Sequence, residues 1–180
     1  NVPKFLEQDI PLFSGILKDL FPGVQVPYVD YGKLQECIET ALLNNNLQKV
    51  PSFISKVIQV HETQLVRHGM MIVGESGSGK SCNHKILAEA LTMLHDEGIE
   101  DKDGFYKQVD RLILNPKSIA AGELYGEFNL ATNEWRDGIV PKLVRGCVDQ
   151  LNEGSDNRKW IIFDGPVDAV WIENMNTVLD

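Results

Sequence analysis

The stretch that decides the fold of this chain reads Gly74-Glu75-Ser76-Gly77-Ser78-Gly79-Lys80-Ser81. It fits the pattern G-x-x-x-x-G-K-[ST], in which glycines let the backbone curl until its N–H groups converge on a polyanion. The apolar run 70–73 stands directly before it. Behind it, apolar residues recur at helical spacing, at Ile86, Leu87, Ala90, Leu91 and Leu94. A strand, a glycine-rich loop and a helix in this order predict a phosphate-binding loop.

The ligands that this loop implies are ATP or ADP, together with Mg²⁺. Lys80 is expected to neutralise the β- and γ-phosphates, and the Ser81 hydroxyl to complete the Mg²⁺ coordination sphere. Cys82 follows in the first helical turn and is counted with the nucleotide-binding residues. Glu75 brings a negative charge into the loop, so its side chain is expected to face the solvent.

A second motif indicates what the site does with its nucleotide. The run 160–164 reads as a buried parallel strand with Asp164 at its carboxyl end, a residue suited to holding Mg²⁺ through water. Many ATPases of this class place a glutamate immediately afterwards to orient the attacking water. Here Gly165 and then Pro166 follow, and neither accepts a proton from water. The sequence therefore predicts nucleotide binding with little or no hydrolysis, and no catalytic residue is assigned.

Asp168 is the nearest carboxylate that offers a substitute for the missing glutamate. The other interpretation makes it the N-cap of a helix over 169–172. We favour the cap, because a residue four positions beyond Asp164 has turned away from the phosphate. An active P-loop ATPase that uses Asp168 or a partner's carboxylate is the alternative function. A small phosphotransferase and a purely structural segment with an empty loop are two further alternatives.

Composition and charge exclude several classes of function. The 180 residues are 43% hydrophobic and carry a formal net charge of −9, which disfavours a nucleic-acid surface. No apolar run is long enough to predict a membrane span, and the histidines have no convincing metal-ligand spacing. Three cysteines without paired spacing indicate a reducing compartment; they are Cys37, Cys82 and Cys147.

Residues before the loop read as helices joined by short turns. Asp9 is expected to cap a helix that ends at Leu20, and Asp30 to cap a second that stops at Asn44-Asn45-Asn46. A third helix begins at Pro51. The turn before it, which includes Val50 and Pro51, is expected to lie against a nucleotide base.

From Met70 onward the pattern changes to alternating strands and helices. We expect strands over 70–73, 106–114 and 160–164, with a helix over 139–151 before the last strand. Such alternation implies right-handed crossovers and a parallel sheet covered by helices on both faces. The predicted fold is thus an α/β, three-layer P-loop NTPase with an N-terminal helical segment. Because doubly wound sheets normally have five or six strands, the sheet is expected to be incomplete, as in a fragment of a longer polypeptide.

The segment 115–138 is long and contains Tyr125, Phe128 and Trp135. One interpretation is an insert that contacts another part of a larger assembly, since exposed aromatic residues favour interfaces. The other is a local hydrophobic cap over the edge of the sheet. The sequence does not separate the two.

Several further stretches carry a specific resemblance. They are 66–70 (VRHGM), 115–118 (NPKS), 124–128 (LYGEF), 132–139 (TNEWRDGI) and 163–180 (FDGPVDAVWIENMNTVLD). Together with the loop, they resemble the dynein heavy chain family, its axonemal branch, and most closely the second of its six AAA+ modules. The opening stretches 9–13 (DIPLF) and 19–23 (DLFPG) resemble the junction with the preceding module. The resemblance implies that 1–50 is this helical junction and that 51–180 is a truncated AAA+ nucleotide-binding subdomain.

The resemblance also implies function, partners and location. The parent would be an ATP-driven microtubule motor, and this module would keep ATP as a structural and regulatory ligand. The partners would be the neighbouring AAA+ modules and the linker of the same heavy chain. Microtubules would be contacted only through distant parts, and neither nucleic acid nor membrane would be bound. The location would be the cytoplasm and cytoskeleton, in the axoneme of a cilium or flagellum. Sensor residues and the arginine finger are expected outside these 180 residues.

Overall fold

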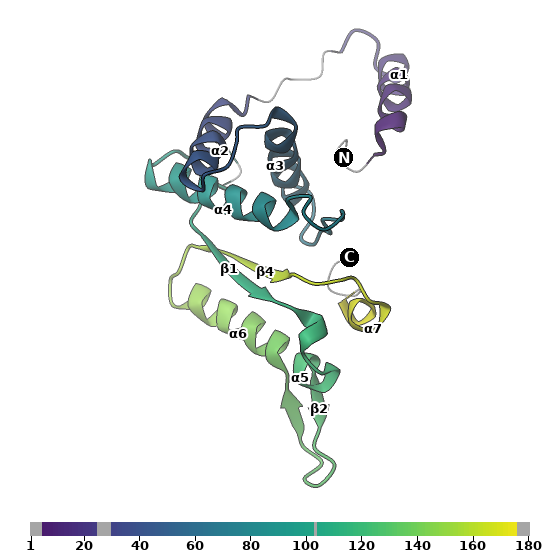
Figure 1. Ribbon diagram of the computed structural model, residues 1–180, viewed down its shortest axis with the longest axis vertical. Helices are drawn as coiled ribbons and strands as arrows, with labels where there is room; N and C mark the ends of the chain where they lie inside the picture. Colours follow the sequence, from purple (N-terminus) through teal and green to yellow (C-terminus); the bar gives the residue numbers. More distant parts are fainter. Residues whose placement is uncertain (1–4, 25–29, 103, 176–180) are drawn as a thin grey trace. The chain divides into compact units, whose positions relative to one another are not determined.

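The computed structural model describes residues 5–24, 30–102 and 104–175 (Figure 1). The chain divides into two compact units, Asn1–Leu87 and Ala88–Asp180, and each is described by itself. Helix α4 (Lys80–Asp96) begins in the first unit and ends in the second. The phosphate-binding loop therefore belongs to the first unit, and Asp164 belongs to the second.

The first unit is helical up to the loop, as the sequence predicts. Its elements are η2 (Glu7–Asp9), α1 (Ile10–Leu20), α2 (Gly32–Asn44), α3 (Pro51–Gln64) and the start of α4. The apolar residues of α2 and α3 are buried because each helix carries them on one face. The buried residues are Leu34, Cys37, Ile38, Ala41, Leu42, Ile54, Val57 and His61.

The predicted helix caps are only partly confirmed. Asp9 has helical backbone angles and makes no side-chain cap bond, because the 3-10 turn η2 runs directly into α1. The prediction that Asp9 caps α1 is therefore wrong. The N-cap residue of α2 is Tyr31 and not the predicted Asp30, but the carboxylate of Asp30 does accept a hydrogen bond from the N–H of Gly32, the first helical residue, at 2.8 Å. As predicted, α2 ends at Asn44 and α3 begins at Pro51.

The second unit holds two small sheets. Its elements after α4 are β1 (Val109–Leu114), η3 (Pro116–Ser118), α5 (Ala121–Tyr125), β2 (Gly126–Phe128), β3 (Trp135–Asp137), α6 (Ile139–Asn152), β4 (Arg158–Phe163), α7 (Ala169–Ile172) and η4 (Glu173–Met175). Strands β1 and β4 pair in parallel, from Val109 opposite Arg158 to Leu114 opposite Phe163. Strands β2 and β3 form an antiparallel hairpin. The predicted parallel arrangement and the crossover helix α6 are thus confirmed.

A hydrophobic cluster joins the carboxyl ends of β1 and β4 to the helices around them. Its buried members are Leu114, Leu124 and Val140, with Ile119, Tyr125, Leu143, Ile161, Phe163 and Trp171 packed against them. At the other end of the strands, Lys159 donates to Asp110, and this hydrogen bond, with a second from Asn157, lowers the pKa of the Asp110 carboxyl.

The predicted strand over 70–73 is absent from the structure. Among the described residues only β1 with β4 and β2 with β3 form ladders, and 70–73 take part in neither. Met71, Ile72 and Val73 are exposed, with Val73 at 79%. An apolar run becomes a strand only when a neighbouring strand supplies its hydrogen bonds, and hydrophobicity alone does not supply them.

The strand predicted over 106–114 begins later, at Val109. The carboxylate of Asp101 accepts from the N–H groups of Phe105 and Tyr106, at 2.6 Å and 3.1 Å, and holds this approach in a turn. The last strand begins two residues earlier than predicted and ends at Phe163, so Asp164 follows it directly. Among the described residues, no helix combines the length and the apolarity that crossing a bilayer requires.

Candidate nucleotide-binding site

The phosphate-binding loop has the backbone that its glycines allow. Gly77 and Gly79 have φ values of 81° and 86°, in the left-handed region where a side chain costs about 1–2 kcal/mol. A Cβ at Gly74 would stand 2.7 Å from the Ser78 hydroxyl oxygen. The N–H of Ser78 donates to the Glu75 carbonyl at 3.2 Å and closes the turn. The pattern thus has a structural reason at each of these three glycines.

Lys80 starts helix α4 and reaches back across the loop. Its ammonium group donates to the carbonyl oxygens of Gly74, at 2.9 Å, and Glu75, at 2.6 Å. The side chain of Glu75 is exposed, as expected, while its carbonyl belongs to the loop. Ser81 is exposed in the first turn of α4, and Cys82 beside it is a half-buried free thiol. A cation above the loop and a hydroxyl on the helix start are the groups that a polyphosphate with Mg²⁺ requires.

Helix α3 lies against this loop through Phe53. The Phe53 ring carbon Cε2 is 3.1 Å from the place where a Cβ at Gly79 would stand. Val50, an extended residue 42% exposed, and Pro51 lie at the start of the same helix. The helix that carries the predicted base-contacting turn is therefore next to the loop. The sequence analysis does not single out Phe53, because apolar residues at helical spacing along 51–65 indicate a packing face and not a ligand site.

We expect Gly79→Ala to weaken ATP binding more than Gly77→Ala. Both substitutions put a side chain on a left-handed backbone, which costs about 1–2 kcal/mol, or roughly tenfold in affinity. Only the alanine at position 79 also meets a neighbour, the Phe53 ring at 3.1 Å, whereas a Cβ at Gly77 has nothing within 4 Å. Titration with fluorescent ATP should show a further loss of about fivefold for Gly79→Ala. Equal losses would contradict a tight contact between α3 and the loop.

The second unit carries the other predicted Mg²⁺ ligand, Asp164, at the carboxyl end of β4. Asp164 is exposed there, and its N–H donates to the Leu114 carbonyl of β1 at 2.9 Å. The parallel pairing thus fixes where the Asp164 backbone leaves the sheet. A carboxylate at the end of a parallel strand is well placed for Mg²⁺, which prefers oxygen ligands. Among the described residues, no group of three or more His, Cys, Asp or Glu forms a metal cluster.

The loop after Asp164 is fixed by aromatic residues. The indole N–H of Trp171 donates to the Pro166 carbonyl at 3.1 Å, and the Trp171 ring stacks on Phe163 with centroids 5.6 Å apart. Asp168 is half-buried directly before α7, and its carbonyl accepts from the N–H of Ile172 at 3.2 Å. Asp168 therefore stands at the N-cap position that the sequence predicts for it.

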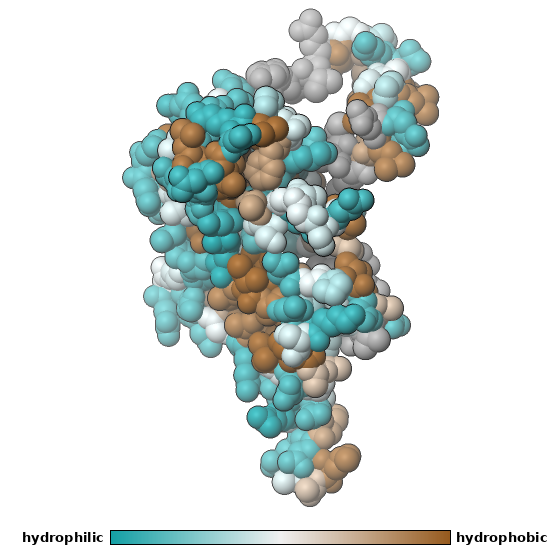
Figure 2. All heavy atoms as spheres, viewed as in Figure 1, coloured by the Kyte–Doolittle hydropathy of each residue, from teal (hydrophilic) through white to brown (hydrophobic). Residues whose placement is uncertain are grey.

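The aromatic segment divides between the two interpretations. Tyr125 belongs to the hydrophobic cluster, and its hydroxyl donates to the Trp171 carbonyl, so it acts as a local cap. Phe128 and Trp135 pack edge to face across the hairpin but are 61% and 52% exposed, and Leu130 at the tip is 99% exposed. Figure 2 shows hydrophobic atoms at the surface of this hairpin, at the lower end of the view. The base of the segment is a cap, and its tip is a free apolar surface.

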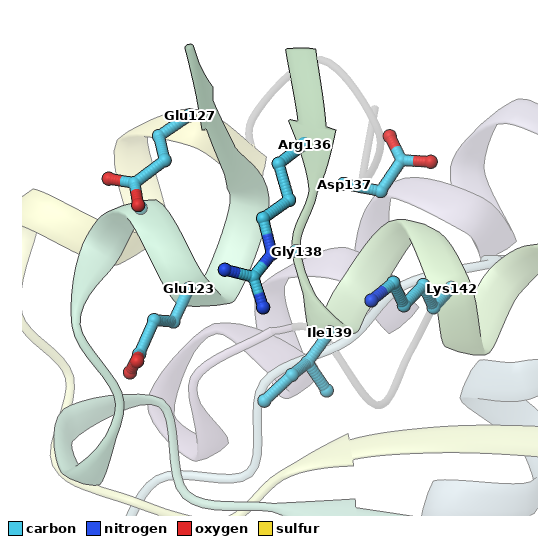
Figure 3. A pocket seen from close by; sticks show the side chains of 8 residues that line it. Glu123, Glu127, Arg136, Asp137, Gly138, Ile139 and Lys142 are labelled. Atoms are coloured by element: carbon cyan, nitrogen blue, oxygen red, sulfur yellow. The ribbon is translucent and has the colours of Figure 1, made fainter. Parts of the chain in front are cut away.

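A hollow of about 300 Å³ lies at the base of the hairpin. Most of the residues that line it are charged, and the others are Gly122, Gly138 and Ile139. Figure 3 shows Arg136 reaching from β3 towards α5, with Glu123 and Glu127 on one side and Lys142 of α6 on the other. Asp137 pairs with Arg145 and accepts from the Trp135 indole N–H at 2.9 Å, and these bonds lower the pKa of its carboxyl. None of the predicted nucleotide or metal residues lines this hollow.

Comparison with known proteins agrees with this geometry. Residues 1–81 match a family model described as the hydrolytic ATP binding site of the dynein motor region. Over all 180 residues the chain is 56% identical to dynein axonemal heavy chain 6 of Homo sapiens. Over 181 aligned positions it is 52% identical to the human dynein axonemal heavy chain 1. The heavy chain 3 of Mus musculus is 50% identical over 180 residues.

The chain belongs to the dynein heavy chain family. All of its length aligns with these relatives, but it spans only about 4% of theirs. The dynein match confirms the α/β P-loop fold of the AAA+ class and a nucleotide-binding role. The matched family model reaches Ser81 and stops before Asp164 and Gly165, so its description as hydrolytic does not bear on those two residues.

Proposed function

We propose that this dynein segment is an AAA+ module that binds ATP with Mg²⁺ and retains it with little or no hydrolysis. Gly74 to Ser81 would cradle the phosphates, with Cys82, Val50 and Pro51 towards the base. Ser81 and Asp164 would provide the protein's oxygen ligands to Mg²⁺. The observation that carries the proposal is the identity of the residues after Asp164, which are Gly165 and Pro166.

The chemistry of hydrolysis explains why these two residues matter. A group that orients and deprotonates water is needed when the γ-phosphoryl moves to a water oxygen. Gly165 has no side chain and Pro166 has no proton acceptor on its ring. Lys80 and Mg²⁺ would neutralise the charge of the phosphates, but neither would accept the proton of the attacking water.

The alternative function is an ATPase in which Asp168 replaces the missing glutamate. Its half-buried position at the start of α7 is compatible with an N-cap, which is a structural role. The loop between Asp164 and Asp168 is held by the Trp171 indole at Pro166. These contacts favour a fixed structural Asp168, and we retain the binding-only function.

The deciding experiment follows the bound nucleotide. A dynein motor in which the P-loop lysines of all other modules are alanine is loaded with Mg-ATP and freed of excess nucleotide. Chromatography after long incubation should recover intact ATP, and Asp168→Asn should leave that recovery unchanged. Conversion of the bound ATP to ADP that Asp168→Asn stops would instead establish the alternative function.

We further propose where the segment works and what it contacts. Residues 1–50 would be the junction from a preceding module, and 51–180 would belong to the second module of the ring in an axonemal dynein. The match of residues 1–81 to the hydrolytic-site family supports the junction. The exposed Phe128, Leu130 and Trp135 favour the linker or a neighbouring module as the partner of the hairpin. The names of the relatives support the cytoskeleton of the axoneme as the location, with microtubules bound by distant parts of the motor.

A further inference from the structure

The Phe53 ring lies directly against the backbone of the phosphate-binding loop at Gly79. A Cβ built on Gly79 would stand 3.1 Å from the ring atom Cε2 and 3.7 Å from Cδ2. Apart from the chain neighbours of Gly79, no other atom of the described residues comes within 4 Å of that point. The ring occupies space that the side chain of any other residue at position 79 would need. It is therefore the contact that limits how this part of the loop can move.

Gly79 is the residue at which such a limit has the largest effect. Its φ of 86° is left-handed, and its carbonyl accepts from the N–H of Asn83 at 2.8 Å, so the loop passes into α4 at this residue. Glycine has more backbone freedom than any other residue. A neighbour that restricts Gly79 therefore keeps the loop in one conformation before a ligand binds, which lowers the entropy cost of binding.

The Phe53 ring is itself carried by a fixed part of the chain. Pro51 occupies the first turn of α3 and sets its own φ, and the N–H of Ile54 donates to the Val50 carbonyl at 3.0 Å. Ile54 is 7% exposed and Val57 is fully buried, so packing holds the face of α3 next to the ring. Phe53 is half-buried. The ring thus joins the loop to a helix start that cannot follow a loosening loop.

Retention of a nucleotide requires slow release as well as slow hydrolysis. The absence of a proton acceptor at Gly165 bears only on hydrolysis, because it does not hold the nucleotide in place. We propose that Phe53 is a positioning residue that slows release, through its contact with Gly79. For the phosphates to leave, the loop has to loosen, and the ring opposes that movement. The inference rests on the proposed function, since it supplies the second condition for retention.

The test measures the release of fluorescent ADP and fluorescent ATP from the motor described above, after excess unlabelled nucleotide is added. Phe53→Ala should release both about tenfold faster, with a much smaller change in the association rate, because substitutions within one site act mostly on dissociation. Phe53→Leu keeps part of the apolar contact and should release them about threefold faster. The matched control is Ile58→Ala. Ile58 is another half-buried apolar residue of α3, and none of its atoms lies within 4 Å of the Cβ position at Gly79. Its release rates should equal those of the unsubstituted motor.

A double-mutant comparison separates positioning of the loop from a general loss of stability. Gly79→Ala is expected to bind ATP about fivefold more weakly than Gly77→Ala, because only the methyl group at position 79 meets the ring. In the Phe53→Ala background this fivefold difference should disappear, since the ring is gone. A general loss of stability would weaken both glycine variants alike and leave the difference between them unchanged.

Two outcomes would overturn the inference. One is release of fluorescent ADP from Phe53→Ala at the rate of the unsubstituted motor or of Ile58→Ala. The other is a fivefold difference between the two glycine variants that persists without the ring. If Phe53→Ala does not fold, Phe53→Leu decides in its place, and unchanged release from it would contradict the role of the ring. Conversion of bound ATP to ADP by the unsubstituted motor would overturn the proposed function instead, while the release rates of ADP would still decide about Phe53.

Discussion

Replacing Lys80 by alanine should lower the affinity of this site for ATP by about a hundredfold. The ammonium group lies across the loop on the carbonyls of Gly74 and Glu75, at 2.9 Å and 2.6 Å. From there it can exchange neutral carbonyl oxygens for charged phosphate oxygens. Charge-assisted hydrogen bonds contribute roughly 1.5–3 kcal/mol each, and about 2.7 kcal/mol corresponds to a hundredfold change in affinity.

The matched control for this prediction is Lys56→Ala. Lys56 lies on α3 in the same unit, and its ammonium donates to the Gln59 side chain at 3.0 Å, on the protein surface. Its removal changes the net charge equally but leaves the loop intact, so affinity should fall less than twofold. Calorimetry with Mg-ATP on the motor in which the other P-loop lysines are alanine measures both variants.

Lys80→Ala also distinguishes a nucleotide-binding site from a loop with a purely structural role. If ATP binds and stabilises the loop, hydrogen exchange in α3 and α4 should slow when ATP is added to the unsubstituted protein. In Lys80→Ala that protection should disappear, while exchange without nucleotide stays unchanged. A loss of protection that is equal with and without ATP would contradict the binding role and favour a structural lysine.

The features that the sequence predicts correctly are those determined by neighbours in the chain. The phosphate-binding loop, the α3 start at Pro51 and α6 depend on glycine conformation, proline geometry and helical spacing. Each of these acts over a few residues, so one sequence contains the information. The position of Asp164 directly after a strand is of the same kind.

The features that sequence reasoning misses depend on pairing between distant segments. The run 70–73 has the composition of a strand but no ladder among the described residues. A Cβ at Gly165 would stand 2.7 Å from the Asn115 side-chain oxygen because β1 and β4 align in one register, although residues 116–164 separate the two in the chain. The Phe53 ring at Gly79 likewise joins a helix to a loop that its spacing does not predict.

Gly138→Ala should lower the stability of the second unit much more than Gly146→Ala, although both substitutions add one methyl group. A Cβ at Gly138 would stand 2.5 Å from both the carbonyl carbon and oxygen of Leu124, and 2.6 Å from the amide nitrogen of Gly126. These are backbone atoms, so no side-chain rotation relieves the clash. Leu124 is 1% exposed in the hydrophobic cluster that includes Leu114 and Val140, and the strain must therefore spread into that core. Overpacking of this kind costs about 1–3 kcal/mol or more.

Gly146→Ala is the matched control, because it adds the same methyl group at a position where no clash arises. Gly146 lies within α6, the helix that Gly138 precedes, and a Cβ there would have nothing within 4 Å. Alanine is a better helix former than glycine by about 0.5–1 kcal/mol, so this variant should be slightly more stable than the parent. Hydrogen exchange of α5, β2 and β3 should therefore accelerate about tenfold or more in Gly138→Ala and stay unchanged or slow in Gly146→Ala.

Because the loop from Gly74 to Ser81 belongs to the other unit, Gly138→Ala should change the affinity for ATP much less than Lys80→Ala does. If Gly138→Ala removed ATP binding as completely as Lys80→Ala does, ATP binding by the loop would depend on the base of the hairpin. The prediction that the two units act independently in this respect would then be wrong.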